Sequence, residues 1–200
     1  MTDLVLVRHG ETVWHAENRY AGRSDVPLTP RGHEQAEALA GWAAGTAVDA
    51  VLTSPLGRAR DTAGPVCAAL GLEARVDERL VEVDFGQGEG RTREEMDEAF
   101  PEALAAFLAH PATRPLPGGE SGAEAVARAL PALAESTAAH PEGRVLVIAH
   151  QTVLRLLLCS LLGLPLDHYR AVFPKLESTA RTVVRPAARG PAALVCLNVA

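Results

Sequence analysis

Short, almost uninterrupted apolar runs alternate with longer segments of helical periodicity along this chain. The runs cover residues 4–7, 48–53 and 145–149, and each ends at a polar side chain. Continuous apolar runs of this length are typical of strands that are buried on both faces, as in a parallel sheet. Each run therefore predicts a central strand.

Helix signals follow each of these predicted strands. Thr29-Pro30 and Ser54-Pro55 are start signals, because serine and threonine cap helix N-termini and proline is tolerated in the first turn. Glycine or proline follows where a helical pattern stops. In chain order the predicted helices run from Pro30 to Gly45, from Leu56 to Leu70, onward from the capping box of Ser121 and Glu124, and from Thr152 to Leu162.

This alternation predicts a three-layer α/β/α sandwich with a mainly parallel sheet, in a single domain that covers residues 1–200. Two further strands are expected near 181–185 and 193–199. An acid-rich segment at 77–98 and a proline- and glycine-rich stretch break the pattern before Ser121. We interpret residues at about 85–120 as a lid insertion that leaves the sheet and roofs the site, since long loops in compact domains are usually functional.

Composition and charge narrow the classes of partner. The chain has 200 residues, a formal net charge of −6 and a single lysine, Lys175, among 19 basic residues. With this charge we expect no surface that binds nucleic acid or an anionic membrane, because such surfaces need clustered positive charge. Three cysteines without paired spacing indicate buried, reduced thiols. The N-terminus lacks the pattern of a signal peptide, so we expect a cytoplasmic protein.

Histidine follows two of the predicted central strands. His9 comes directly after the first, and His150 after the strand at 145–149. Because the carboxyl ends of parallel strands share one edge of the sheet, where ligands of such folds bind, we expect the two imidazoles to converge there. This convergence is the first indication of chemistry.

Five ordered motifs resemble those of the histidine phosphatase superfamily, whose members have the phosphoglycerate-mutase-like fold. The resemblance spans nearly the whole chain, and five motifs in the family's order are far more specific than one. The motifs are Arg8-His9-Gly10-Glu11-Thr12, the segment Ser54 to Ala63, the segment Leu80 to Gly86, Gly118-Gly119-Glu120-Ser121 and Val147-Ile148-Ala149-His150.

The resemblance implies that His9 attacks phosphorus. A neutral imidazole can do so at physiological pH without a metal. Arg8 and Arg58 would hold the phosphoryl oxygens, because a guanidinium fork matches phosphate geometry. His150 would complete this cradle from the other strand end.

A proton donor is also required, because an alkoxide is a poor leaving group. Glu82 resembles the family's donor, and a bound phosphate dianion nearby would favour its protonated form. Asp84 lies two residues away, on the same face if the segment is extended, and competes for this role.

Three positions depart from the family pattern. His15 stands where relatives commonly carry an asparagine that holds the phosphate, so the contact is expected to become pH dependent. Ala21 replaces a glutamine, and Gln151 replaces a glycine and would bring a side chain towards the rim. We expect these three residues to line the substrate site.

We therefore predict a phosphatase of small phosphomonoesters that uses a phosphohistidine and needs no cofactor or metal. An acidic roof would repel a bisphosphate, which favours a phosphatase over a cofactor-dependent phosphoglycerate mutase. The second alternative is a catalytically silent, phosphate-binding regulatory domain. An edge strand near either terminus would allow a homodimer.

Overall fold

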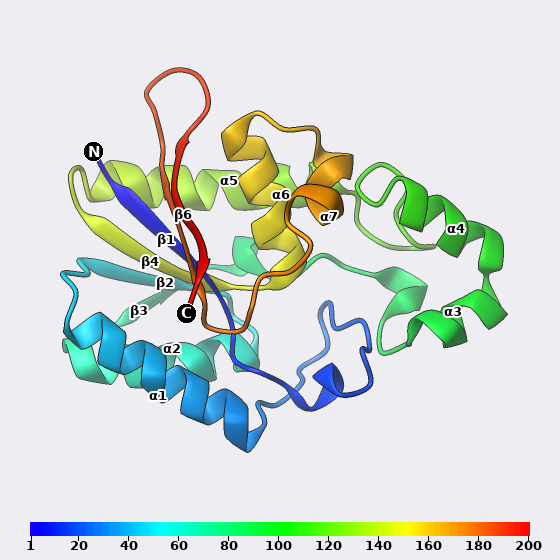
Figure 1. The fold of residues 1–200 in the computed structure, drawn as a ribbon, viewed down its shortest axis with the longest axis horizontal. Helices are drawn as coiled ribbons and strands as arrows, with labels where there is room; N and C mark the ends of the chain where they lie inside the picture. The colour runs from blue at the N-terminus through cyan, green and yellow to red at the C-terminus, as the bar shows by residue number, and fades with distance from the viewer.

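One six-stranded sheet, in the order β3-β2-β4-β1-β5-β6, forms the centre of the computed structural model, which describes residues 1–200 (Figure 1). Strands β3, β2, β4 and β1 are parallel to one another, and β5 and β6 continue the sheet in antiparallel pairing. The strands are β1 (Asp3–Arg8), β2 (Ala50–Thr53), β3 (Ala74–Val76), β4 (Arg144–Ala149), β5 (Arg181–Arg185) and β6 (Ala193–Val199).

Helices cover both faces of this sheet, so the predicted three-layer α/β/α sandwich is confirmed. Helices α1 and α2 lie on one face, and α5 and α6 lie on the other (Figure 1). The α-helices are α1 (Pro30–Ala44), α2 (Gly57–Leu70), α3 (Arg93–Ala99), α4 (Pro101–Ala109), α5 (Gly122–Ala139), α6 (Gln151–Leu162) and α7 (Tyr169–Val172), and short 3₁₀ turns cover Val13–His15, Glu78–Leu80, Gly86–Gly88 and Leu166–His168. None of these helices is both long and apolar enough to cross a lipid bilayer.

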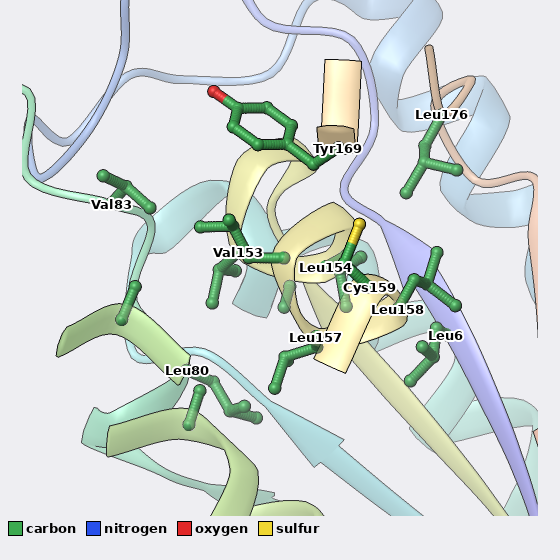
Figure 2. Close-up of a cluster of buried hydrophobic side chains, with 14 of the residues drawn as sticks. Leu6, Leu80, Val83, Val153, Leu154, Leu157, Leu158, Cys159, Tyr169 and Leu176 are labelled. Atoms are coloured by element: carbon green, nitrogen blue, oxygen red, sulfur yellow. The ribbon is translucent and has the colours of Figure 1, made fainter. Parts of the chain in front are cut away.

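The apolar runs fill two cores because successive side chains of a strand point to opposite faces. In β1, Val5 and Val7 pack towards α1 and α2, whereas Leu4 and Leu6 pack towards α5 and α6. The core on the side of α5 and α6 is built largely on α6, whose apolar side chains project among residues of β1 and of the segment that follows β3 (Figure 2). Both histidine-bearing strand ends are therefore held in a rigid interior.

Several local expectations need correction. Strand β2 begins at Ala50 rather than at residue 48, and β3 is an additional parallel edge strand. Helix α2 begins at Gly57 without a side-chain cap, because its N-cap residue is Leu56, and the Ser54 hydroxyl contacts the ring of His150. All three cysteines are free thiols, but only Cys159 is buried.

The chain leaves the sheet after Val76, at the end of β3, and the lid insertion that follows carries α3 and α4 to one side of the sandwich (Figure 1). A capping box of Thr92 and Glu95 begins α3, and Glu95 also forms an ion pair with Arg19, at 2.8 Å. This pair joins the insertion to the loop that follows β1. Of the insertion, only Phe85 reaches the candidate site, so the insertion forms a side wall and not the predicted roof.

Glycine is required where the loop after β1 meets α1. A Cβ atom built on Gly10 would lie 2.6 Å from the carbonyl oxygen of Gly32, and one built on Gly32 would lie 2.1 Å from that of Glu11. Both contacts are with backbone, which cannot swing away as a flexible side chain can. The glycine after His9 thus allows the loop to rest directly on α1.

Replacing Gly32 with alanine is expected to lower the free energy of unfolding by about 1–3 kcal/mol, because the added methyl group must displace backbone. Urea denaturation measures this loss. Gly41→Ala in the same helix is the matched control, since nothing lies within 4 Å of its added Cβ. The control should be neutral or stabilising by up to about 1 kcal/mol. Equal stability of the two variants would contradict the close approach.

Candidate active site

The register of β1 and β4 brings His9 and His150 together. Arg8 is paired with Ala149, so the next residue of each strand emerges at the same edge of the sheet. The backbone N–H of His9 donates to the Ala149 carbonyl at 3.0 Å. The two ring centroids are 5.2 Å apart with an interplanar angle of 57°. The predicted convergence of the two imidazoles is confirmed.

A pocket of about 660 Å³ opens at this edge, and its walls are positively charged. Five cationic side chains line it against two acidic ones, Glu11 and Glu82. The cationic residues are Arg8, Arg19, Arg155, Arg170 and Lys175. The acidic residues of the lid insertion do not line this pocket, so the expectation that an acidic roof would repel a second phosphate is wrong.

His9 lines the pocket as a neutral base with one free nitrogen. Its Nδ1 lies 2.7 Å from the Gly10 carbonyl oxygen, which can only accept, so Nδ1 carries the proton and Nε2 keeps its lone pair. Burial lowers the pKa of His9 well below its usual value, and the charges of Arg8 and Arg58 lower it further. The imidazole is therefore in the form that a nucleophile needs.

Arg8 is held by its neighbours, but its Nε–H has no partner. Its Nη1 donates to Gln151 Oε1 at 3.0 Å and to the Leu176 carbonyl at 3.1 Å, and its Nη2 lies 2.5 Å from His15 Nε2. Its Nε is the only buried side-chain nitrogen or oxygen atom without a partner. Burial lowers the pKa of this guanidinium to about 10, so it remains charged at neutral pH. A buried charged donor of this kind is costly unless an acceptor binds to it.

Arg58 and His150 lie behind His9 and do not line the pocket. Arg58 Nε donates to His150 Nδ1 at 3.2 Å, so His150 Nε2 carries the proton and donates to the Ser54 hydroxyl at 2.7 Å. The remaining Arg58 nitrogens donate to the carbonyls of Ala21, Gly22 and Ser24. These bonds use four of the five Arg58 N–H groups, and the phosphate contact that the sequence predicts for Arg58 and His150 stays a prediction.

Ala21, one of the three departures from the family pattern, lines the pocket, and its carbonyl accepts from Arg58 Nη2 at 3.3 Å. Gln151 was expected at the rim, but its side-chain oxygen points inward to Arg8 and also accepts from the Leu176 backbone N–H at 3.4 Å. It therefore orients the guanidinium, a role that the sequence pattern did not indicate.

His15, for which the sequence pattern predicted a contact with phosphate, also contacts Arg8. Its Nε2 lies 2.5 Å from Arg8 Nη2, and its Nδ1 accepts from the Thr12 backbone N–H at 3.0 Å and lies 2.8 Å from the Thr12 hydroxyl oxygen. Burial and the charge of Arg8 lower the pKa of His15 to about 4. The ring is therefore neutral across the physiological range, so the pH-dependent contact expected there falls well below neutral pH.

Acidification from pH 6.5 to pH 4 is expected to destabilise the protein, because unfolded histidine takes up a proton in this range and folded His15 does not. His9 and His150 act in the same direction, since burial also lowers their pKa values. Urea midpoints across this range measure the effect. His15→Asn should reduce the slope of the unfolding free energy against pH by up to the contribution of one bound proton. An unchanged slope would contradict a lowered pKa of His15 in the folded protein.

The structure separates the two candidate proton donors. The Glu82 side chain is buried and lines the pocket. Its Oε1 accepts from the backbone N–H groups of Val83 and Val153, and its Oε2 accepts from that of Thr152, each at 2.8 Å. Asp84 lies outside the pocket, where it accepts from the Gly86 N–H and faces Arg23 at 3.4 Å. Glu82 is thus the candidate that can reach a pocket ligand.

A half-buried ion pair supports the segment that carries Glu82. Arg128 contacts both carboxylate oxygens of Glu120, at 2.6 and 2.8 Å, and donates to the carbonyls of Arg79, Val81 and Glu82. Sequence reasoning singled out the motif that contains Glu120 but assigned it no role. Arg128 was missed, because a single arginine on a helix face looks like any surface residue until its partners are known.

No group of three or more histidine, cysteine, aspartate or glutamate side chains gathers closely enough to hold a metal ion. The pocket instead combines a neutral imidazole, an unused guanidinium donor and a carboxyl group. This set of groups can bind an oxyanion, attack it and exchange a proton with its leaving group.

Comparisons with known proteins agree with this chemistry. Phosphoserine phosphatase 1 of Hydrogenobacter thermophilus is 34% identical over 169 residues, which cover 84% of this chain and 80% of that protein. A probable phosphoglycerate mutase GpmB of Salmonella choleraesuis is 35% identical over 165 residues, or 82% and 77% of the two chains. Among solved structures, mycobacterial glucosyl-3-phosphoglycerate phosphatase superimposes with a TM-score of 0.89 at 29% identity, covering 99% of each chain.

Phosphatases are thus among the relatives of this chain in sequence and in structure. The family model of the histidine phosphatase superfamily (branch 1) matches residues 4–199, which include every motif singled out above. The match extends from the first strand of the sheet to the last. This chain belongs to the histidine phosphatase superfamily, branch 1.

Proposed function

We propose that this chain hydrolyses small phosphomonoesters through a phosphohistidine on His9, with Glu82 as the proton donor and without a metal or cofactor. One observation carries the proposal. The Gly10 carbonyl accepts from His9 Nδ1, which leaves the Nε2 lone pair free, and Arg8, which lines the same pocket, has an Nε–H without a partner. A phosphoryl group fits both features, because it offers phosphorus to the base and oxygen to the donor.

In the first step, Nε2 of His9 bonds to phosphorus and the ester P–O bond breaks. The departing alkoxide takes the proton of Glu82. Only one N–H donates to Oε2 of Glu82, whereas two donate to Oε1, so Oε2 keeps an acceptor position at which to hold that proton. Arg8 stabilises the charge that gathers on the phosphoryl oxygens.

In the second step, a water molecule attacks phosphorus and the P–N bond breaks. Ionised Glu82 takes a proton from this water, which returns the acid to its starting form. The other products are inorganic phosphate and neutral His9. Each cycle therefore consumes one water molecule and no other reactant.

Arg58 and His150 serve this proposal from behind the nucleophile. The charge of Arg58 lowers the pKa of His9, after burial and the charge of Arg8, and so helps to keep the nucleophile neutral. Arg58 uses four of its five N–H groups, on His150 and on the carbonyls of Ala21, Gly22 and Ser24, which leaves one Nη1 N–H for phosphate. Arg58 also positions His150, to whose Nδ1 its Nε donates at 3.2 Å.

Trapping the intermediate tests this function directly. The chain is mixed with ³²P-labelled 4-nitrophenyl phosphate, quenched and separated from free label. We expect acid-labile, base-stable label on the intact chain and none on His9→Ala. Turnover should also survive treatment with a chelator. Phosphate binding without label or turnover would instead indicate a silent regulatory domain.

The cationic pocket keeps phosphoglycerate mutase as a second candidate, because five positive side chains can accommodate a substrate with two phosphates. Incubation with 3-phosphoglycerate and catalytic bisphosphoglycerate distinguishes the two activities. A phosphatase releases inorganic phosphate. Formation of 2-phosphoglycerate without phosphate release would identify a mutase.

A further inference from the structure

The lid insertion contacts the loop that holds Arg58 through a carboxylate that the proposed reaction does not use. This carboxylate belongs to Glu89, which directly follows the 3₁₀ turn Gly86–Gly88. Its side chain is half-buried and does not line the pocket. Its hydrogen-bond partners are backbone N–H groups and not basic side chains. A carboxylate that is bound in this way orders the backbone that donates to it.

Two backbone N–H groups of the loop after β1 donate to Glu89. The backbone nitrogen of Gly22 lies 2.9 Å from both Oε1 and Oε2, and the Ser24 N–H donates to Oε1 at 3.1 Å. Hydrogen bonds to an ionised acceptor are about twice as strong as those between neutral groups. Glu89 therefore fixes two peptide groups of one short segment, residues 22–24.

The same segment binds Arg58 with its carbonyl groups. The Ser24 carbonyl accepts from Arg58 Nη1 at 2.6 Å, and the Gly22 carbonyl accepts from Nη2 at 2.7 Å. Gly22 and Ser24 thus donate to Glu89 and accept from Arg58. Nη1 also carries the one Arg58 N–H that has no protein acceptor. Because the guanidinium is planar and rigid, the bond to Ser24 also sets the direction of this free N–H.

The charge of Arg58 also depends on its surroundings. The side chain is buried, and burial lowers its pKa, whereas the carboxylates of Glu82 and Glu89 oppose this shift. In the proposed cycle Glu82 loses and regains a proton, so its charge is not constant. Glu89 lies outside the pocket and takes no part in this proton transfer. Its carboxylate therefore supports the guanidinium charge throughout the cycle.

We propose that Glu89 is a positioning residue, which holds the 22–24 segment so that the carbonyls of this segment aim the free Nη1 N–H of Arg58 at the phosphoryl group. The inference rests on the proposed phosphatase function. It gives the lid insertion a part in the reaction, although Phe85 is the one residue of the insertion that lines the pocket. The connection is short, because Glu89 and Arg58 bind the same two residues.

Replacement of Glu89 by alanine is expected to lower kcat/KM for 4-nitrophenyl phosphate by about tenfold or more, since the loss of one charge-assisted hydrogen bond has an effect of this size. The variant should fold, because backbone bonds from Gly90 to Tyr20 and from Tyr20 to Arg91 still join the insertion to the loop. Glu98→Ala is the matched control, since Glu98 is an exposed glutamate of α3 in the same insertion. An unchanged rate in Glu89→Ala overturns the proposal.

A double-mutant cycle distinguishes the positioning of Arg58 from a general structural role of Glu89. Arg58→Met removes the side chain through which Glu89 is proposed to act. Adding Glu89→Ala to Arg58→Met should then lower kcat/KM by about twofold at most, because a residue that acts through Arg58 has no further effect once Arg58 is gone. A second loss as large as the loss in the unsubstituted chain overturns the proposal, because the effects of independent defects add.

Binding of inorganic phosphate to the His9→Ala protein separates this inference from the proposed function. Calorimetry in this background reports how tightly the pocket holds phosphate even if the chain has no phosphatase activity. Adding Glu89→Ala should weaken phosphate binding by about tenfold, whereas adding Glu98→Ala should leave it unchanged. Equal affinities with and without Glu89→Ala overturn the inference, whatever the outcome of the trapping experiment.

Discussion

Replacement of His9 by alanine is expected to lower kcat by about 10⁵-fold or more, the scale of loss seen when a covalent nucleophile is removed. His9 is the pocket-lining imidazole whose Nε2 is left free by the bond from Nδ1 to the Gly10 carbonyl. No other pocket group can replace it, because the ring of His15 is occupied by Arg8 and Thr12. Phosphate release from 4-nitrophenyl phosphate and from 3-phosphoglycerate measures the loss.

The fold should survive this change, since the loop after β1 is held by backbone contacts with α1. Circular dichroism and urea denaturation check this point. His33→Ala is the matched control, because His33 is an exposed histidine of α1 outside the pocket. Full turnover by a folded His9→Ala protein would refute the assignment of the nucleophile, and an equal loss in His33→Ala would point to a general effect on the preparation.

Replacement of Glu82 by glutamine is expected to lower kcat on alkyl phosphates by about 10²- to 10⁴-fold, because the leaving alkoxide needs a proton. Aryl phosphates such as 4-nitrophenyl phosphate should lose about tenfold or less, since their phenolate leaves without protonation. The measurement is therefore the ratio of the two losses. A structural defect alone would lower both rates by the same factor.

The same substitution should also destabilise the protein. The amide nitrogen of glutamine cannot accept the bond that Glu82 Oε2 takes from the Thr152 N–H, which costs about 1–3 kcal/mol of unfolding free energy. Asp84→Asn is the matched control, because Asp84 lies outside the pocket. A selective loss on alkyl phosphates in Asp84→Asn, but not in Glu82→Gln, would transfer the role of proton donor to Asp84.

The convergence of His9 and His150 was predictable because it depends on few facts. Two apolar runs predict buried parallel strands, and the carboxyl ends of such strands share an edge. The register between β1 and β4 then places the residue after Arg8 beside the residue after Ala149. Two helix N-caps were also predictable from the sequence, since Thr29 and Ser121 cap α1 and α5 at the predicted starts.

The electrostatics of the site were not predictable to the same degree. Counting acidic residues in the insertion suggested an acidic roof, but those residues do not line the pocket, and Phe85 is the one residue of the insertion that does. Residues that are distant in sequence supply the positive charge instead, among them Arg155 and Arg170. The sign of a pocket depends on which side chains point into it, and composition does not contain that information.

Sequence alone determined the layered α/β framework, the family resemblance and the choice of His9 as the proposed nucleophile, because these follow from local periodicity and from motifs of adjacent residues. Only the tertiary structure decided how those residues are used. In the structure, His15 and Gln151 contact Arg8, and Arg58 contacts His150 behind His9. Arg128 supports the segment that carries Glu82. Each of these contacts joins side chains whose partner is chosen by packing in three dimensions, so no pattern along the chain encodes it.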